Sequence, residues 1–559
     1  MTARKGSLAA PLFFLSLAAV CAGSRLGFVA PWAAAASLLG LAGWAGATGE
    51  VIPRSRLSAA VFCYALLVAL NTLLVSPAYT PAGLYHPLLL CTAFLVARRF
   101  PDRTELGAAI AALTMGAILA AWGLAQIGPL GVARAHAIFE TPATYAAVVN
   151  LLLVPLLALA MTGRRAAWVL ALGGLLAAAI FAAGSRGGLL ALAAGLGTAA
   201  ILALRAGMMQ RRGLVLALAL LAAGWILAAG LRALPWGDLA ESGVETPPTA
   251  EAQSASSQSR LELYDLSRTA WLERPLTGTG YLTFRYVLEQ GRAKVPSYGE
   301  LLETWFVHND YLQTLQELGP LGLAALLALV GLPAWLGHRR IPLLPMERRD
   351  APLAAAAALA AMGFHALVDF PFYIPVCLVL YGALLGSLDR KLGEGEPRAA
   401  QPLHAAMWFR AARAGFLLLA GVILLRPVVA EAAAEWGLSR SERGHSQSAA
   451  FWLEAARRLE PVDWRYHWYA GQFWDGQASV SGRREAARLA AQAYAAGFEA
   501  NRLDVRNLLG KISVQRRHGK LLDAPADART QARWVAEAEA LAPFNDAVRR
   551  ERALLGAAQ

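Results

Sequence analysis

Residues 167–205 read AWVLALGGLLAAAIFAAGSRGGLLALAAGLGTAAILALR and contain two long apolar runs separated by one short polar turn. A helix of about 20 apolar residues crosses the hydrocarbon core of a bilayer, which is roughly 30 Å thick. The two runs, 167–183 and 187–204, therefore predict a pair of membrane helices. The turn between them, Gly184-Ser185-Arg186-Gly187-Gly188, places one arginine at a membrane face.

Similar apolar runs occur along most of the chain. The 559 residues are 57% hydrophobic and have a mean hydropathy of +0.44, which excludes an ordinary soluble protein. The runs that are long enough to span a bilayer are 8–23, 27–46, 57–75, 84–97, 105–127, 142–161, 167–183, 187–204, 214–234, 317–336, 351–368, 373–388 and 412–430. They predict an all-α polytopic membrane protein with about 12 to 13 transmembrane helices. The first run is interpreted as a retained span and not as a cleaved signal peptide.

Basic residues are distributed unequally between the two sides of these predicted spans. Every second connection carries a basic cluster, whereas the turns between them hold only Arg25, Arg134 and Arg186. Because Lys and Arg resist translocation, the basic side is predicted to be cytoplasmic, together with the N-terminus. A long loop, 236–316, and the C-terminal tail then lie outside, which in a bacterium is the periplasm. We therefore expect a protein of the bacterial inner membrane, surrounded by membrane lipids.

The charge and the cysteines point to no further partner or cofactor. The net charge of +13 largely reflects the basic cytoplasmic connections, so no nucleic-acid partner is predicted. All four cysteines fall in apolar runs, and no disulfide framework is implied. The sequence holds no metal-binding pattern on its exported side and no P-loop, so neither a metal nor a cofactor is expected. An enzyme of this kind would need a substrate that already carries its activation energy.

The chain divides into a membrane domain, 1–430, and a soluble helical domain, 431–559. Within the long loop, residues 241–259 are polar and are predicted to be disordered, whereas 260–272 have the spacing of an amphipathic helix on the membrane surface. The tail is predicted to form helices at 449–459, 464–474, 483–497, 502–518 and 528–541. These helices resemble degenerate tetratricopeptide repeats, but a small bundle around the tryptophans explains the same pattern. Whether the tail forms such repeats or a small bundle, we expect it to dock a possible protein partner or to stabilise the protein and not to carry out catalysis.

Three polar residues at the exported face are candidates for chemistry. An arginine placed deep in a bilayer costs roughly 2.5 to 3.5 kcal/mol, so Arg186 is predicted to be functional, although it could also extend to the interface as an anchor. Arg260, taken alone, has the pattern of an ordinary surface residue. His308 lies where the loop re-enters the membrane. An imidazole can accept a proton at neutral pH, but a structural role explains this position equally well.

Other polar residues occur near the same face. His365 and Asp369 are four residues apart and are predicted to share one helix face, where they could bond to each other or line a cavity. Arg134 and His136 form a second polar pair in an exported turn. Two further polar residues, Asn309 and Asp310, directly follow the candidate histidine.

Five stretches, taken in order, carry a resemblance to a known family. They are 134–147, 184–190, 260–280, 308–322 and 365–370. Their order resembles the O-antigen ligase and polymerase family of bacterial envelope glycosyltransferases, and a helical-repeat tail is similar to what some members carry. Residues Thr141-Pro142-Ala143 depart from the usual pattern, which bears on the preference for donor or acceptor.

The resemblance implies transfer of a glycan from undecaprenyl diphosphate to an acceptor hydroxyl at the periplasmic face, without a metal. Arg186 and Arg260 match the family's two essential arginines, and His308 matches its essential histidine. The arginines would stabilise the departing diphosphate through bidentate contacts, and the histidine would accept the hydroxyl proton. The residues expected to contact the substrates are Arg134, His136, Asn309, Asp310, His365 and Asp369.

The sequence is compatible with three acceptors: the lipid A core, a growing polysaccharide and a protein. We expect a ligase that acts on the lipid A core, followed by a polymerase and then by a protein O-oligosaccharyltransferase. A flippase for lipid-linked glycans would also have many spans, but transporters tend to place ionisable groups near the bilayer midplane, whereas here they cluster at one face. A scaffold that recruits partners through its tail is a further alternative.

Overall fold

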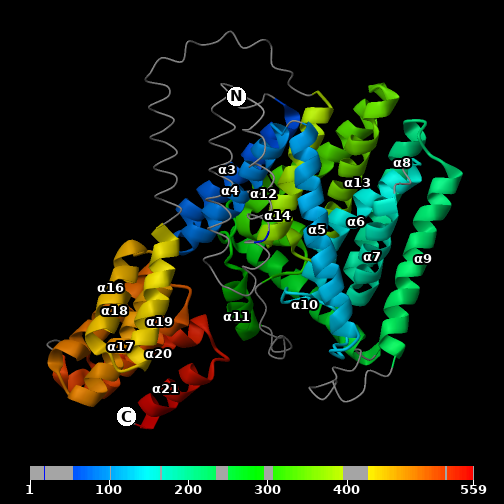
Figure 1. Cartoon of the computed structure of the whole chain (residues 1–559). Coiled ribbons are helices and arrows are strands. Elements are labelled where there is room, and N and C mark those ends of the chain that lie inside the picture. Colours follow the sequence, from blue (N-terminus) through cyan, green and yellow to red (C-terminus); the bar gives the residue numbers. More distant parts are fainter. Residues whose placement is uncertain are drawn as a thin grey trace, which may run out of the picture.

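Every element that the structure describes is a helix (Figure 1). The structure, a computed structural model, describes residues 55–100, 102–163, 167–234, 250–294, 306–393, 426–522 and 526–557, together with Ala18. The predicted all-α fold class is confirmed. The helices of the membrane bundle are α3 (Arg56–Val75), α4 (Thr80–Arg98), α5 (Asp102–Ile127), α6 (Pro142–Met161), α7 (Ala167–Ala183), α8 (Arg186–Arg205), α9 (Arg211–Ala233), α12 (Asp310–Arg340), α13 (Asp350–His365) and α14 (Pro375–Lys391).

Six described helices are long and apolar enough to cross a membrane, so the chain is a polytopic membrane protein. They are α3, α5, α6, α8, α9 and α12, and α4 and α7 are shorter apolar helices. The predicted spans at 351–368 and 373–388 form the helices α13 and α14, of 16 and 17 residues. The predicted spans at 8–23 and 27–46, and most of 412–430, lie outside the described residues except for Ala18. The count of 12 to 13 spans therefore stays a prediction.

The centre of the bundle is formed by α6 and α13, whose side chains are buried along most of their length. α13 is rich in alanine over residues 354–361 and packs against α6 and α8. α14 packs along α4 so closely that a Cβ on Gly386 would lie 2.2 Å from the carbonyl oxygen of Phe94. Small residues at helix contacts allow this approach, which is typical of helices in a bilayer. Trp225 and Ile226 of α9 stay exposed, as expected for a surface that faces lipid.

The polar loop between α9 and α12 is helical over much of its described length. It contains α10 (Ala250–Glu273) and α11 (Phe284–Lys294). Because α10 begins at Ala250, the prediction of disorder is wrong for residues 250–259. Leu263 and Leu266 of α10 pack in a small core with α11 and Val307. The predicted contact of this helix with the membrane surface stays a prediction.

α12 begins before the predicted span, at Asp310, and bends at Gly319, whose φ is +70°. Glycine is needed at this bend because a Cβ would lie 2.1 Å from the carbonyl oxygen of Leu276, in a backbone conformation that other residues seldom adopt. The approach is mutual, since a Cβ on Gly278 would lie 2.4 Å from the carbonyl oxygen of Glu317. The segment after α10 is thus held against the start of α12.

The tail consists of a helical run at 426–442 followed by six helices. These are α16 (Ser446–Leu459), α17 (Trp464–Ser481), α18 (Arg484–Ala500), α19 (Val505–His518), α20 (Ala528–Leu541) and α21 (Asp546–Ala557). The five predicted helices are confirmed with shifts of up to seven residues at their ends, whereas α21 was not predicted. The tetratricopeptide interpretation stays a prediction.

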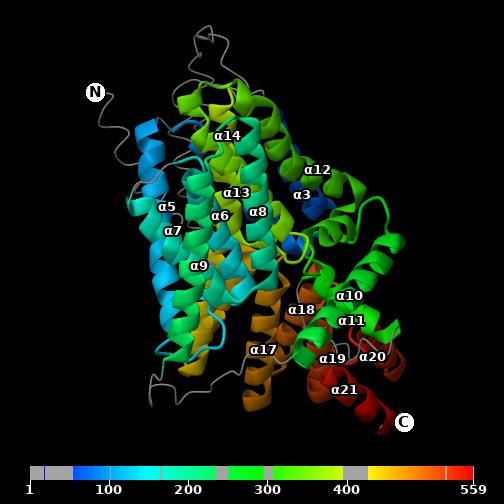
Figure 2. The ribbon, with the colours of Figure 1, turned by 90° about the vertical axis from the view of Figure 1, so that its right-hand side faces the viewer.

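The tail lies at the same end of the bundle as α10 and α11 (Figures 1 and 2). One tyrosine makes the main polar connection between them. The hydroxyl of Tyr286, on α11, donates to the Asp504 carboxylate at 3.1 Å and accepts from the Asn501 amide at 3.1 Å. The same hydroxyl is hydrogen-bonded to Tyr79, which precedes α4. The tail is therefore attached to the loop segment that separates Arg260 from His308.

Candidate active site

Polar turns from distant parts of the sequence meet at the end of the bundle near α10 and α11 (Figure 2). Nη1 of Arg260, on α10, donates to the carbonyl oxygen of Val368 at 3.3 Å, in the turn after α13. The N–H of Asp310, at the start of α12, donates to Ala366 in the same turn at 2.8 Å. A Cβ on Gly187 would lie 3.6 Å from Nε2 of His365, which places the start of α8 beside this turn. Three helix ends and the middle of α10 thus form one site.

Asp369 lies between two histidines in this site. Nδ1 of His308 is 3.3 Å from one carboxylate oxygen, and Nε2 of His365 is 3.5 Å from the other. Burial alone would raise the pKa of the Asp369 carboxyl, but the two imidazoles outweigh burial and hold this pKa below its usual range. Because an ionised carboxylate can only accept hydrogen bonds, Nδ1 of His308 donates to it. The other ring nitrogen of His308, Nε2, is then the one that can accept a proton.

The backbone holds His308 in an uncommon conformation. Its φ is +58°, in the left-handed region that residues other than glycine seldom adopt. The Tyr264 hydroxyl donates to the His308 carbonyl oxygen at 3.1 Å. The imidazole ring packs edge-on against Phe370, with ring centroids 5.0 Å apart. Strained conformations persist where the surroundings determine them, and they cluster at functional sites.

Four arginines lie at the same end of the bundle: Arg134, Arg186, Arg232 and Arg260. Nε of Arg134 donates to the Ala183 carbonyl at 3.2 Å, and Nη2 of Arg232 donates to the Ala182 carbonyl at 2.8 Å. Both guanidinium groups therefore bind the C-terminal end of α7, which carries partial negative charge. Arg186 is exposed at the first position of α8, and Arg260 is half-buried.

The positive charges are close enough to affect one another. Burial lowers the pKa of Arg134, and the charges of Arg186, Arg260 and Arg232 lower it further. An arginine stays protonated despite such a shift. Among the residues that the structure describes, the ion pairs of this site are those of Asp369 with the two histidines, and no acid pairs with the arginines. The site therefore favours an anionic ligand.

The chemistry available here is anion binding combined with proton transfer. Guanidinium forks contact phosphate oxygens in pairs and so hold a diphosphate well. Nε2 of His308 can take a proton from a hydroxyl that lies within hydrogen-bonding reach. In the described part of the chain, no group of three or more His, Cys, Asp or Glu side chains is placed to hold a metal ion.

The predicted site residues fall into two sets. The site brings together Arg134, Arg186, Arg260, His308, His365 and Asp369. The predicted contact between His365 and Asp369 is made, but α13 ends at His365, so the two meet across a turn and not along one helix face.

Three other predicted residues make contacts that hold turns. Nδ1 of His136 lies 2.8 Å from the Phe139 carbonyl oxygen in its own turn. Asn309 is the N-cap of α12. The Asp310 carboxylate is fully buried and accepts from the Phe372 N–H at 2.9 Å. Their role in substrate binding stays a prediction, since each already has a structural function.

Sequence reasoning missed three residues that shape the site. Arg232 ends a long apolar run, and its charge at the predicted exported end of that run was the available signal. Tyr264 follows Arg260 by four residues, a spacing that places both on one helix face. The buried Glu317 carboxylate accepts from the Leu282 N–H at 3.0 Å and from the Tyr373 hydroxyl at 2.7 Å. Only its long-range contacts, which no local pattern encodes, reveal Glu317.

The apolar helices and this cationic site define a polytopic membrane protein with a cluster of arginines at one end of its bundle. Residues 171–327 match the family model described as O-antigen ligase. Over these residues the chain is similar to the O-antigen ligase family, and the resemblance found in its sequence is confirmed. The matched region includes Arg186, Arg260 and His308. A search of curated proteins found no match to the chain.

Proposed function

We propose that this chain is an O-antigen ligase-like glycosyltransferase that moves a glycan from undecaprenyl diphosphate to a hydroxyl of the lipid A core, without a metal or other cofactor. The family supports glycan transfer of the ligase or polymerase type in general. The observation that carries the proposal is the pairing of His308 with Asp369 beside four arginines, because it joins a proton acceptor to an anion-binding group.

The arginines would act on the donor. When the bond between the anomeric carbon and the diphosphate oxygen breaks, the electron pair leaves with the diphosphate and negative charge grows there. Arg186 and Arg260 would bind these oxygens through their guanidinium forks. Arg134 and Arg232, already held by the carbonyls of α7, would add positive charge nearby.

His308 would act on the acceptor. The acceptor oxygen forms the new bond to the anomeric carbon, and its proton passes to Nε2 of His308. Asp369 accepts the hydrogen bond from Nδ1, so it would orient the ring and stabilise the imidazolium that forms. Undecaprenyl diphosphate leaves as the second product, and the proton is released to solvent.

The reaction is placed at the periplasmic face of the inner membrane. The distribution of basic residues supports this orientation, since Arg98 ends α4 and Arg205 ends α8 at the end of the bundle opposite the site. A polysaccharide polymerase or a protein O-oligosaccharyltransferase would use the same groups with another acceptor. The lipid A core is the acceptor that we propose.

The test is transfer in vitro by the purified full-length protein from a defined undecaprenyl-diphosphate-linked glycan. Lipid A core, polysaccharide and an unglycosylated protein are offered in turn, and product on the lipid A core is expected. His308→Ala should lower the rate by about 10² to 10⁴-fold. His338→Ala, at the far end of α12, is the matched control and should stay active.

Each other result identifies the part of the proposal that fails. If glycan were transferred only to polysaccharide or only to protein, that acceptor would replace the lipid A core in the proposal. A fully active His308→Ala variant would contradict the mechanism. Movement of the lipid-linked glycan across vesicles, with no transfer to any acceptor, would favour a flippase.

A further inference from the structure

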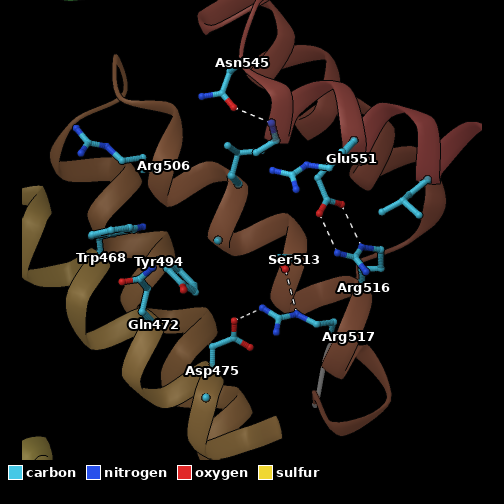
Figure 3. Close-up of a pocket in the computed structure, with 16 residues that line it drawn as sticks. Trp468, Gln472, Asp475, Tyr494, Arg506, Ser513, Arg516, Arg517, Asn545 and Glu551 are labelled. Carbon is cyan, nitrogen blue, oxygen red and sulfur yellow. Dashed lines mark hydrogen bonds and ion pairs between the residues drawn. The ribbon is translucent and has the colours of Figure 1, made fainter. Parts of the chain in front are cut away.

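The tail contains a groove of about 640 Å³ that is separate from the candidate active site (Figure 3). One face each of α17, α19 and α21 lines it, with residues spaced three or four apart along each helix. Trp468 and Gln472 come from α17, Ser513 and Arg517 from α19, and Arg550 from α21. Three helices that are not adjacent in sequence thus share one concave surface.

The lining of this groove is polar and carries excess positive charge. Its large aliphatic side chains are limited to Leu509 and Leu554. The lining also has four arginines, two carboxylates and the amides of Gln472 and Asn545. Because Asp504 pairs with Arg506 beside the groove, the excess is one positive charge. The half-buried ring of Trp468 lines the same space, and the buried Tyr494 lies beneath it.

Several of the groove's arginines are held in place by other side chains. Arg517 pairs with Asp475 and also donates to the Ser513 hydroxyl at 3.1 Å. Arg516 binds Glu551 through two hydrogen bonds, of 3.1 and 2.9 Å. A guanidinium has five N–H donors, so each of these arginines keeps donors for a ligand. Planar groups that are fixed in this way lose little conformational freedom on binding.

The groove is connected to the loop that carries part of the candidate active site. Arg506 lines the groove and stacks over Trp464, with its guanidinium carbon 4.1 Å from the ring centroid. The same arginine donates to Asp504 at 3.0 Å, and Asp504 accepts the hydroxyl of Tyr286 from α11. One chain of contacts therefore leads from the groove to the segment between Arg260 and His308.

We propose that this groove binds an acidic oligosaccharide, such as a stretch of glycan that contains uronic acids. Arginine forks match the carboxylates, the amides can bind neighbouring hydroxyl groups, and an aromatic ring can pack on the apolar face of a sugar. A peptide that docks in a groove normally inserts apolar anchors into apolar pockets, which this lining scarcely offers. The choice of a glycan over an acidic peptide rests on the proposed function.

Binding can be measured on the full-length protein in detergent, with no donor or acceptor present. The probes are hexagalacturonate, neutral maltohexaose and a hexaglutamate peptide, followed by calorimetry. Hexagalacturonate is expected to bind at least about tenfold more tightly than either of the others. Equal or tighter binding of hexaglutamate or maltohexaose would overturn the proposal.

Two variants test whether the binding takes place in the groove. Arg517→Gln and Arg550→Gln should each weaken binding of hexagalacturonate about tenfold, because each removes a charged donor. Arg533→Gln, on the exposed surface of α20 outside the groove, is the matched control and should bind as the parent does. Unchanged binding in both groove variants, with thermal unfolding like that of the parent, would contradict the assignment.

The same measurement on His308→Ala separates this inference from the proposed function. That variant should bind hexagalacturonate normally while transfer is lost. Transfer in the parent protein without hexagalacturonate binding would overturn the groove assignment alone. Binding without transfer to any acceptor would overturn the proposed function alone.

Discussion

Several cations at the two ends of the helix bundle are held by different kinds of partner. At one end, Arg98 lies 2.5 Å from the buried Asp389, and Lys391 lies 2.9 Å from Glu105. At the other end, Arg134, Arg232 and Arg260 bind backbone carbonyls, and Arg186 has no acidic partner among the described residues. The Asp369 carboxylate at that end contacts two histidines.

We infer that the cations paired with carboxylates stabilise the fold, whereas the arginines bound to carbonyls are available to bind a ligand. A buried ion pair is largely neutral, and loss of one partner damages the structure because the other charge stays behind. A carbonyl fixes the position of a guanidinium group but carries no net charge to cancel it. Four arginines that are positioned but not neutralised are suited to a diphosphate.

The largest loss of glycan transfer among the arginine and aspartate variants is expected from Arg186→Ala and Arg260→Ala. Each should lower the rate about 10² to 10³-fold, since a donor that stabilises developing negative charge is typically worth about 2.7 to 4 kcal/mol. Arg→Lys variants should keep part of the activity, because they retain the charge and lose the fork. Near-normal rates of glycan transfer in both alanine variants would show that these arginines do not serve the reaction, contrary to the role inferred for this end of the bundle.

A smaller loss is expected from Asp369→Asn. The amide keeps the size of the side chain but removes the negative charge that orients His308, and orienting partners of a histidine are worth about 10- to 100-fold elsewhere. Asp265→Asn, on the exposed surface of α10, is the matched control for transfer assays. If Asp369→Asn transferred glycan as fast as the parent, His308 would be acting without this carboxylate.

Arg98→Ala should leave transfer by the folded protein unchanged and lower its stability. The substitution removes the guanidinium group that pairs with Asp389, whose side chain is fully buried. Breaking such a pair typically costs about 3 to 5 kcal/mol. Thermal unfolding in detergent would report the loss, with the exposed Arg103→Ala as the control. If Arg98→Ala were as stable as the parent but impaired in transfer, Arg98 would serve the reaction and not the stability of the fold.

The smallest effect concerns pH. The pKa of Asp369 is lowered in the folded protein, so its ionisation stabilises the fold above the unfolded pKa of about 3.9, and this contribution is lost as pH falls towards the folded pKa. The difference in unfolding temperature between the parent and Asp369→Asn should shrink as pH falls from about 5 to about 3. A difference that grew over this range would show that the shift has the opposite sign.

Local sequence patterns predicted the helices better than the site. Apolar runs report directly on membrane helices, and the glycine-flanked Arg186 stood out in its turn because a charge there needs a reason. The contact of His308 with Asp369 joins residues 61 positions apart, so no local spacing encodes it. Arg232 was missed because it ends an otherwise apolar run.

The prediction of disorder at 241–259 failed in part for a cooperative reason. Low hydrophobicity indicates that a segment buries little, but a helix that is already anchored can extend into such a segment at small cost. Leu263 and Leu266 anchor α10 in a buried core, and the helix continues back to Ala250. Burial of the later turns was therefore enough to order the earlier ones.

The mutual approach of Gly278 and Gly319 has a mechanical consequence. Each backbone occupies the space that the other's Cβ would need, so the segment after α10 cannot slide along α12 without a clash. α10 is thereby pinned at its C-terminal end, while Arg260 lies further back along the helix. If a lipid-linked substrate enters by displacing α10, the helix must pivot about this pin and carry Arg260 with it. We therefore expect the entrance to open on the Arg260 side and to close as the arginine reaches the diphosphate.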